Sequence, residues 1–196
     1  MAKNLRLGLF VEGKTEKTYI EKLKSFLIRK YGEGKILNID VKLAGGIIDI
    51  TLCNKIIKRG ELDNYDYIYF VVDREEDKAR QQIITELEYL LNNHKYKKYI
   101  KLIVSNPSFE IWLLFHFLDT KKKNYKIKEI ISELNKFGNY DKEQKILEQF
   151  CDENIFNNKN LEKFENAITN AIKNKNNDYQ YSCSNFYEFI DILNKN

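Results

Sequence analysis

The chain contains few of the residues that build tight turns and disulfide frameworks. Its 196 residues include one proline, eight glycines and three cysteines. So few turn residues argue against an all-β fold, because such a fold needs many tight turns. Cys53, Cys151 and Cys183 are odd in number and show neither metal-ligand spacing nor a paired framework. We therefore expect a cytoplasmic protein, since that compartment keeps thiols reduced.

Long apolar runs are also missing. The longest, Ile111 to Leu118, contains His116 and is far shorter than the roughly 20 residues that cross a bilayer. No signal-peptide pattern precedes the first apolar segment, so we expect no membrane association. Apolar residues make up 43% and charged residues 32%, which describes a folded domain. The net charge of +4 is compatible with nucleic acid, but a general bias toward lysine, asparagine and isoleucine across the chain is the better explanation of the charge alone.

Apolar segments alternate with helical patterns through the first 120 residues. The segments 5–11, 36–43, 65–72 and 99–104 are typical of strands, and amphipathic stretches separate them. This alternation predicts an α/β fold with a parallel sheet of about four strands flanked by helices. After a charged break at 121–124, residues 121–196 are rich in lysine and asparagine. We expect residues 1–120 to form the catalytic core and 121–196 a helical C-terminal extension packed on it.

Two of the predicted strands stop on a carboxylate. Glu12 follows the first strand, and Asp73 follows the third. The carboxyl ends of parallel strands share one edge of the sheet, where open α/β folds bind their ligands. Neighbouring strands lie about 5 Å apart, so the two side chains can converge. The pattern predicts a site for Mg²⁺ or Mn²⁺ built from Glu12 and Asp73, with Glu16, Glu75 and Asp77 as supporting acids.

Some of these acids have a second interpretation. Glu16 and Asp77 suit the first turn of a helix, where carboxylates cap free amides and oppose the helix dipole. Glu110 lies on an apolar helix and is costly to bury alone. It should therefore face a metal, a basic side chain or the site. The alternative is a capping bond near Ser105 or Asn106.

Basic and polar side chains near the acids suggest substrate contacts. Lys14 and Arg74 flank the two strand ends and could grip phosphates, although ordinary surface charge is the alternative. We also place Ser105 and Asn106 at the substrate. His116 is interpreted as a packing residue rather than a ligand.

The sequence resembles the RloB-like proteins in three blocks that span most of residues 5–117. The blocks are Glu12-Gly13-x-Thr15-Glu16-x-x-Tyr19, Asp73-Arg74-Glu75, and Ser105-Asn106-Pro107-Ser108-Phe109-Glu110-Ile111-Trp112-Leu113-Leu114-x-His116-Phe117. That family is similar to the Toprim domains of OLD-type nucleases, topoisomerases and primases. The resemblance implies a glutamate at the first strand end and Asp-x-Asp at the third. Glu75 departs from this pattern, because it stands where the second aspartate is expected.

Two functional hypotheses follow. The first is a metal-dependent nuclease of Toprim type that cuts DNA or RNA, including tRNA. Glu12 would be a metal ligand or general base, Asp73 and Glu75 would be metal ligands, and Glu16, Asp77 and Glu110 would support them or hold a second metal. The resemblance also implies an ATPase partner of ABC or AAA type and a role in bacterial defence against phage. The second hypothesis is a non-catalytic regulatory or sensor subunit of an ATPase complex. Both hypotheses leave a homo-oligomer open.

Overall fold

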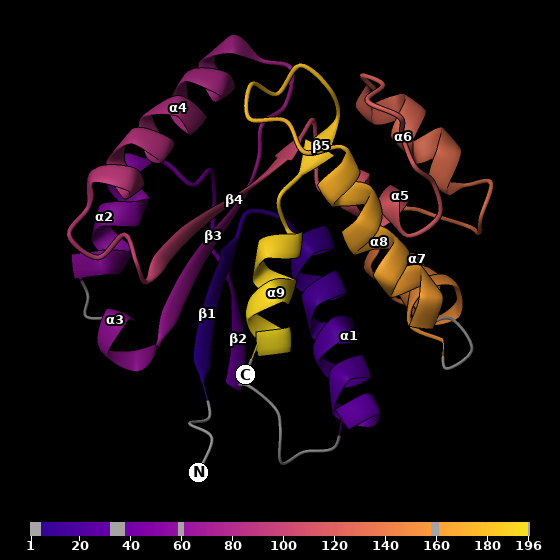
Figure 1. The fold of residues 1–196 in the computed structure, drawn as a ribbon, viewed down its shortest axis with the longest axis horizontal. Helices are drawn as coiled ribbons and strands as arrows, with labels where there is room; N and C mark the ends of the chain where they lie inside the picture. The colour runs from indigo at the N-terminus through magenta and orange to yellow at the C-terminus, as the bar shows by residue number, and fades with distance from the viewer. Residues whose placement is uncertain (1–4, 32–37, 59–60, 158–160, 196) are drawn as a thin grey trace.

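The computed structural model describes residues 5–31, 38–58, 61–157 and 161–195, and it has the predicted α/β architecture (Figure 1). The first part of the chain contains β1 (Arg6–Val11), α1 (Lys14–Tyr31), β2 (Asn38–Leu43), α2 (Ile50–Lys58), α3 (Glu61–Asn64), β3 (Tyr67–Asp73), α4 (Lys78–Asn93), β4 (Ile100–Asn106) and α5 (Glu110–Phe115). The second part contains α6 (Ile127–Leu134), α7 (Gln144–Phe150), the π-helical turn η2 (Cys151–Ile155), α8 (Leu161–Lys173), β5 (Cys183–Ser184) and α9 (Tyr187–Lys195).

The sheet has five strands in the order β2-β1-β3-β4-β5. The first four are parallel, as predicted. The fifth strand, β5, was not predicted and runs antiparallel to β4, pairing Ser184 with Ser105 and Cys183 with Asn106. A strand of two residues is too short to show the alternation of side chains that identifies strands in a sequence. The mostly parallel sheet confirms the predicted fold class.

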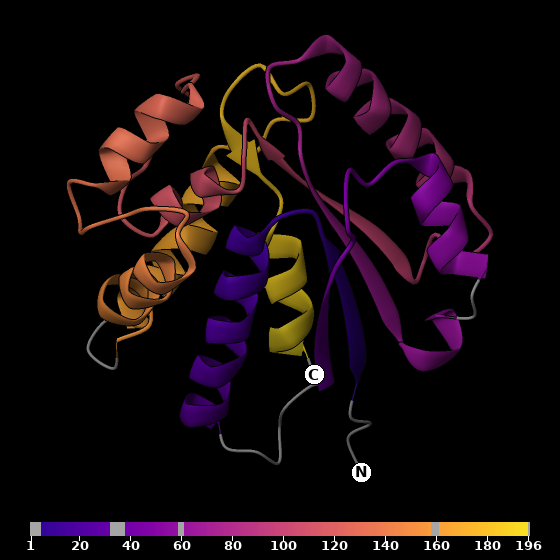
Figure 2. The same cartoon turned by 180° about the vertical axis from the view of Figure 1, so that it is seen from behind.

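Each face of the sheet packs against its own set of helices. Leu9, Val11 and Tyr69 point into a cluster shared with α1 and the helices that follow β4. Phe10 and Phe70, one residue along, point into the cluster shared with α2 and α4. This alternation is the two-residue period of a strand. Figures 1 and 2 show the resulting three layers, with α2 and α4 on one side of the sheet and α1 and α9 on the other.

The larger cluster joins the C-terminal helices to the sheet. Tyr19 on α1 is fully buried, and its ring centroid lies 5.5 Å from Phe109, 5.1 Å from Phe156 and 5.8 Å from Phe186. Its hydroxyl lies 3.1 Å from His116 Nε2, and burial lowers the pKa of that histidine to about 4. A neutral, hydrogen-bonded imidazole in this cluster is the packing residue that the sequence indicated.

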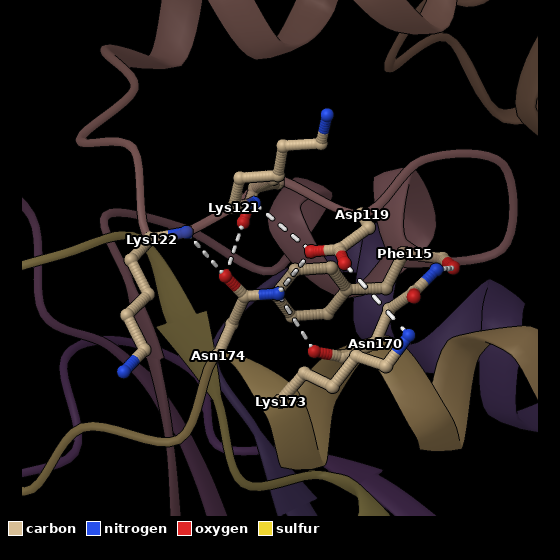
Figure 3. Close-up of polar contacts among 8 residues, drawn as sticks. Phe115, Asp119, Lys121, Lys122, Asn170, Lys173 and Asn174 are labelled. Atoms are coloured by element: carbon tan, nitrogen blue, oxygen red, sulfur yellow. Dashed lines mark hydrogen bonds and ion pairs between the residues drawn. The ribbon is translucent and has the colours of Figure 1, made fainter.

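A polar network fastens α8 to the segment that follows α5 (Figure 3). Asn174 Oδ1 accepts hydrogen bonds from the Thr120 hydroxyl at 2.9 Å and from the Lys122 amide at 2.7 Å. Its amide nitrogen donates to Asp119 Oδ1 at 3.0 Å. One turn earlier, Asn170 donates to the carbonyl oxygen of Phe115 at 2.9 Å. Two of these bonds satisfy backbone groups of the segment that leaves α5, the Lys122 amide and the Phe115 carbonyl.

The structure also bears on the cysteines and on membrane-spanning segments. Cys53, Cys151 and Cys183 are all buried free thiols. In the ranges that the structure describes, no helix has both the length and the apolar character that a membrane span requires.

Candidate active site

A cleft of about 470 Å³ opens at the carboxyl edge of the sheet. Its lining consists of Glu12, Gly13, Lys14, Thr15, Glu16, Gly46, Ile47, Asp73, Glu75, Arg80, Glu110 and Lys142. We call it the acidic cleft. It brings together five of the six predicted acids, with Lys14, from segments that are far apart in the sequence. Parallel strand ends account for this convergence, because β1 and β3 are neighbours and both stop here.

Glu12 lines the acidic cleft and accepts hydrogen bonds from three separate parts of the chain. Its Oε1 accepts the amide of Ile48 at 2.6 Å, and its Oε2 accepts the amide of Asp73 at 3.2 Å. The same Oε2 accepts a short hydrogen bond from the guanidinium of Arg80. The carboxylate is thus held in one position by the end of β3, the segment before α2, and α4.

Arg80 is a site residue that the sequence argument missed. It is 4% exposed, and its Nε donates to the carbonyl oxygen of Asp73 at 2.7 Å. Another guanidinium nitrogen, Nη1, is buried and has no hydrogen-bond partner among the described residues. From the sequence alone, an arginine on α4 is indistinguishable from surface charge, because only the fold shows that this helix begins beside two strand ends.

Glu16 and Asp73 are acids in an environment that disfavours their charge. Glu16 is 3% exposed, and burial, with the nearby carboxylates of Glu110 and Glu12, raises its pKa from 4.5 to about 7. Burial, with repulsion from Glu16 and Glu110, also raises the pKa of Asp73 well above its ordinary value. Asp73 Oδ1 is buried and has no hydrogen-bond partner among the described residues. The site therefore holds several carboxyl groups so close together, and so buried, that protonation of Glu16 and Asp73 is favoured.

Glu110 is the acid that receives a cation from the C-terminal part of the chain. Lys142, between α6 and α7, places Nζ 2.7 Å from Glu110 Oε1, and the Tyr140 hydroxyl donates to the same oxygen at 3.1 Å. Burial is the largest influence on the pKa of Glu110 and would raise it, but the charge of Lys142 and the hydrogen bonds to the carboxylate together outweigh burial, so the pKa is lowered. The basic partner that Glu110 required therefore comes from the polar half of the sequence, where no local pattern marks it.

The other predicted site residues lie outside the acidic cleft. Asp77 is the N-cap of α4, where its Oδ2 accepts the amide of Arg80 at 3.1 Å. Arg74 stacks on the ring of Tyr179 at 4.8 Å. The Ser105 hydroxyl lies 2.9 Å from that of Ser184, and Asn106 donates to the carbonyl oxygens of Tyr179 and Tyr181. These last three residues contact the C-terminal segment around β5.

Glu75 lies at the rim of the acidic cleft in an unusual backbone conformation. It is exposed and has a φ of 55°, in the left-handed region. Its amide donates to the carbonyl oxygen of Pro107 at 2.8 Å, which fixes the turn after β3. A non-glycine residue pays a conformational cost for this backbone shape. Glu75 thus lines the acidic cleft as an exposed acid, whereas Glu16 and Glu110 are buried.

The chemistry of the acidic cleft fits a hard divalent cation. Its donors are carboxylate oxygens, which Mg²⁺ and Mn²⁺ prefer, and Asp73 Oδ1 and Glu110 Oε2 are buried without hydrogen-bond partners in the described part of the chain. The arrangement is incomplete, however, because no three His, Cys, Asp or Glu side chains in the described ranges form a group that could hold a metal ion. Arg80 and Lys142 instead engage oxygens of Glu12 and Glu110.

Comparison with known families places the sequence clearly. A search of curated proteins and a search of solved structures gave no match. The family model for "RloB-like protein" matches residues 8–193, which is nearly the whole chain and includes both the acidic cleft and the C-terminal helices. The chain therefore belongs to the RloB-like protein family.

Proposed function

We propose that this protein is a metal-dependent nuclease that hydrolyses phosphodiester bonds of DNA or RNA. The observation that carries the proposal is the acidic cleft, where Glu12, Glu16, Asp73 and Glu110 converge at the carboxyl edge of the sheet with Lys14, Arg80 and Lys142. Phosphodiester hydrolysis needs neutralisation of phosphate charge and an activated nucleophile. Carboxylates grouped with cationic side chains at one cleft supply the side-chain chemistry for both.

The acids divide into two roles in this proposal. Asp73, Glu12 and Glu110 would hold Mg²⁺ or Mn²⁺, with Glu75 at the rim, and the cation when bound would polarise the phosphate and activate water. Burial and the neighbouring carboxylates raise the pKa of Glu16 to about 7 in the chain without a metal ion, so this side chain can hold a proton near neutral pH. This makes it the acid best suited to accept a proton from the attacking water or to donate one to the leaving oxygen.

The basic side chains would position the phosphate. Arg80 is fixed through Nε at the end of β3 and lines the acidic cleft, so its guanidinium would attract a phosphate bound there. Lys142 also lines the acidic cleft, half-exposed and paired with Glu110. Arg80 and Lys142 already pair with the carboxylates of Glu12 and Glu110. A metal ion held by those carboxylates would release the two basic side chains to the substrate.

Cleavage of a mixed panel of nucleic acids tests the proposal. Plasmid DNA, single-stranded DNA and bulk tRNA are incubated with the wild-type chain in Mg²⁺ or Mn²⁺, beside Asp73→Asn and Glu12→Gln. Glu76→Gln is the matched control, because Glu76 is an exposed acid of the same loop that does not line the acidic cleft. We expect cutting by wild type and Glu76→Gln only. Cutting by Asp73→Asn at the wild-type rate would exclude the proposed site.

One observation favours a second candidate, a non-catalytic regulatory or sensor subunit of an ATPase complex. The ion pairs Arg80–Glu12 and Lys142–Glu110 already satisfy part of the acidic group, as in a purely structural cluster. In either case we propose that the chain works with an ATPase partner in bacterial defence against phage. Mixing the chain with an ATPase encoded beside it and measuring the mass of the complex separates the two. A stable complex with no cleavage under any condition supports the regulatory subunit.

A further inference from the structure

A second cleft, of about 410 Å³, lies at the amino edge of the sheet, opposite the acidic cleft. Its lining consists of Leu5, Arg6, Asp63, Tyr65, Asp66, Tyr67, Tyr96 and Tyr99. We call it the tyrosine cleft. It lies where β1, β3 and β4 begin, at the end of the sheet where Figure 1 shows α3 and the N-terminus. Half of its lining residues are tyrosines, and its volume is within the range of small-molecule sites.

Two of the four tyrosines in this cleft are exposed, whereas Tyr65 and Tyr67 are partly buried against the two hydrophobic clusters. Tyr96 and Tyr99 are 37% and 44% exposed, and the ring of Tyr99 lies 6.2 Å from that of Tyr67. Large aromatic side chains usually bury their faces, because each offers a large apolar area. Several partly exposed rings around one hollow therefore offer flat apolar surfaces on which another planar ring can stack.

Positive charge is interleaved with these rings. Residues 94–101 read His-Lys-Tyr-Lys-Lys-Tyr-Ile-Lys, with four lysines, two tyrosines and no carboxylate. Lys95 Nζ lies 4.7 Å from the centre of the Tyr96 ring, and Lys98 Nζ lies 5.7 Å from that of Tyr99. The two acids of the cleft are near Arg6, which pairs with Asp66 at 3.8 Å and donates to the backbone oxygen of Asp63.

We propose that the tyrosine cleft binds single-stranded nucleic acid. Bases would displace the ammonium groups of Lys95 and Lys98 from the faces of the Tyr96 and Tyr99 rings and stack there. The displaced ammonium groups would then pair with the flanking phosphates. This combination of an aromatic platform with a cationic track is how proteins bind single strands without reading their sequence. A duplex fits poorly, because its bases are already stacked on one another and present only their edges. A phosphate-binding patch alone would leave the exposed tyrosines unexplained.

The proposal does not depend on the nuclease activity. Six residues of β1 and seven of β3 separate the two clefts, a distance of roughly 20 Å at the usual rise of a strand. Binding at the tyrosine cleft is therefore measured without any chemistry at the acidic cleft. If both sites operate, the tyrosine cleft holds a strand at a distance from the site of cutting.

Fluorescence anisotropy with labelled oligonucleotides of about 12 nucleotides tests the proposal, since single-strand sites span roughly 4–16 nucleotides. Oligouridine and oligothymidine are titrated with the full chain carrying Asp73→Asn, in EDTA, so that cleavage plays no part. Loss of one stacking ring weakens single-strand binding by about 5-fold to about 150-fold, and we expect this range for Tyr96→Ala and for Tyr99→Ala. Tyr96→Phe, which keeps the ring, should bind as the parent does.

Two further comparisons make the result decisive. Tyr89→Ala is the matched control, because Tyr89 is 74% exposed on α4 but does not line the tyrosine cleft, and it should leave the affinity unchanged. Replacing Lys95 and Lys98 with serine should flatten the dependence of log K on log salt by about 0.7 for each phosphate that the protein no longer neutralises. Absence of single-strand binding by the parent chain, or equal binding by parent and Tyr96→Ala/Tyr99→Ala, would overturn the proposal. So would tighter binding of a duplex of the same length.

Discussion

Lys142 and Glu110, which are 32 residues apart in the sequence, form an ion pair of 2.7 Å in which the carboxylate side chain is 1% exposed and the lysine side chain 52%. The pair joins the segment between α6 and α7 to the buried acids at the carboxyl edge of the sheet. The acidic cleft is consequently built from both halves of the chain.

Removal of Lys142 should destabilise the fold. Lys142→Met leaves Glu110 buried without its cation, and breaking a buried pair costs about 3–5 kcal/mol. Because water screens the half-exposed Lys142, we expect a smaller loss, of about 1–2 kcal/mol in the free energy of unfolding at pH 7. Urea titration measures the loss.

The surface pair Lys136–Glu133 is a matched control for that experiment. Its distance is also 2.7 Å, but its side chains are 62% and 27% exposed. Lys136→Met should change the free energy of unfolding by less than about 0.5 kcal/mol. Equal effects of Lys136→Met and Lys142→Met would contradict the assigned role of burial.

The free energy of unfolding should fall as the pH rises from about 4.5 to about 7, because Glu16 titrates in this interval. The native pKa of Glu16 is about 7, above its ordinary value of 4.5, so the native state binds more protons than the unfolded state between these values. Stability attributable to Glu16 is therefore full below about pH 4.5 and is lost by about pH 7, a change on the order of 3 kcal/mol. The raised pKa of Asp73 acts in the same direction.

Glu16→Gln isolates the contribution of that one acid. Glutamine keeps the shape of the side chain but does not titrate, so the variant should be more stable than wild type above pH 7. Its free energy of unfolding should also vary less between pH 4.5 and pH 7. Denaturant unfolding at several pH values measures both quantities, and curves that stay parallel for the two proteins would argue against the raised pKa.

Neutralising Asp73 and neutralising Glu12 should shift the melting temperature in opposite directions. Asp73→Asn removes a carboxyl group whose charged form is disfavoured by burial and by the neighbouring carboxylates, so we expect it to raise the melting temperature at pH 8. Glu12→Gln leaves the buried guanidinium of Arg80 without its carboxylate and should cost about 2–4 kcal/mol. Thermal unfolding of the two variants beside Glu76→Gln, which should melt with wild type, checks the signs. If both variants were destabilised, the Asp73 carboxylate would have to make favourable contacts in the native protein.

Sequence patterns were sufficient for the parts of the structure that are local. Apolar runs that end on a carboxylate identified β1 and β3, and the parallel arrangement of these strands predicted that Glu12 and Asp73 would meet. Arg80 and Lys142 could not be found in this way, because their roles depend on where α4 begins and on how the C-terminal helices fold back. The two-residue β5 was missed for a related reason. It is a strand because it pairs with β4, and its own two residues carry no strand pattern.

Asn185 illustrates the same limit, and it gives another prediction. Its Oδ1 accepts the amide of Val104 at 2.7 Å, and its Nδ2 donates to the carbonyl oxygen of Leu102 at 3.1 Å. One side chain thus makes the two hydrogen bonds that a neighbouring strand would make to the edge of β4. Asn185→Ala should lower the free energy of unfolding by about 1–3 kcal/mol.

Asn185→Asp separates the two hydrogen bonds. Aspartate can still accept from the Val104 amide, but its other oxygen would face the carbonyl oxygen of Leu102, so the Val104 amide should stay protected even though the free energy of unfolding falls. Hydrogen exchange at the Val104 amide reports the bond directly and should accelerate in the alanine variant. Unchanged exchange there would show that the side chain does not protect the edge of β4.

Titration of the chain with Mn²⁺, followed by electron paramagnetic resonance, tests the central claim that the acidic cleft is a divalent-cation site. The signal of free Mn²⁺ falls as the ion binds, so wild type, Asp73→Asn and Glu76→Gln are compared at pH 7.5. The account predicts that wild type and Glu76→Gln bind the ion alike and that Asp73→Asn binds it at least tenfold more weakly. Equal binding by all three proteins, or no binding by wild type, would contradict it.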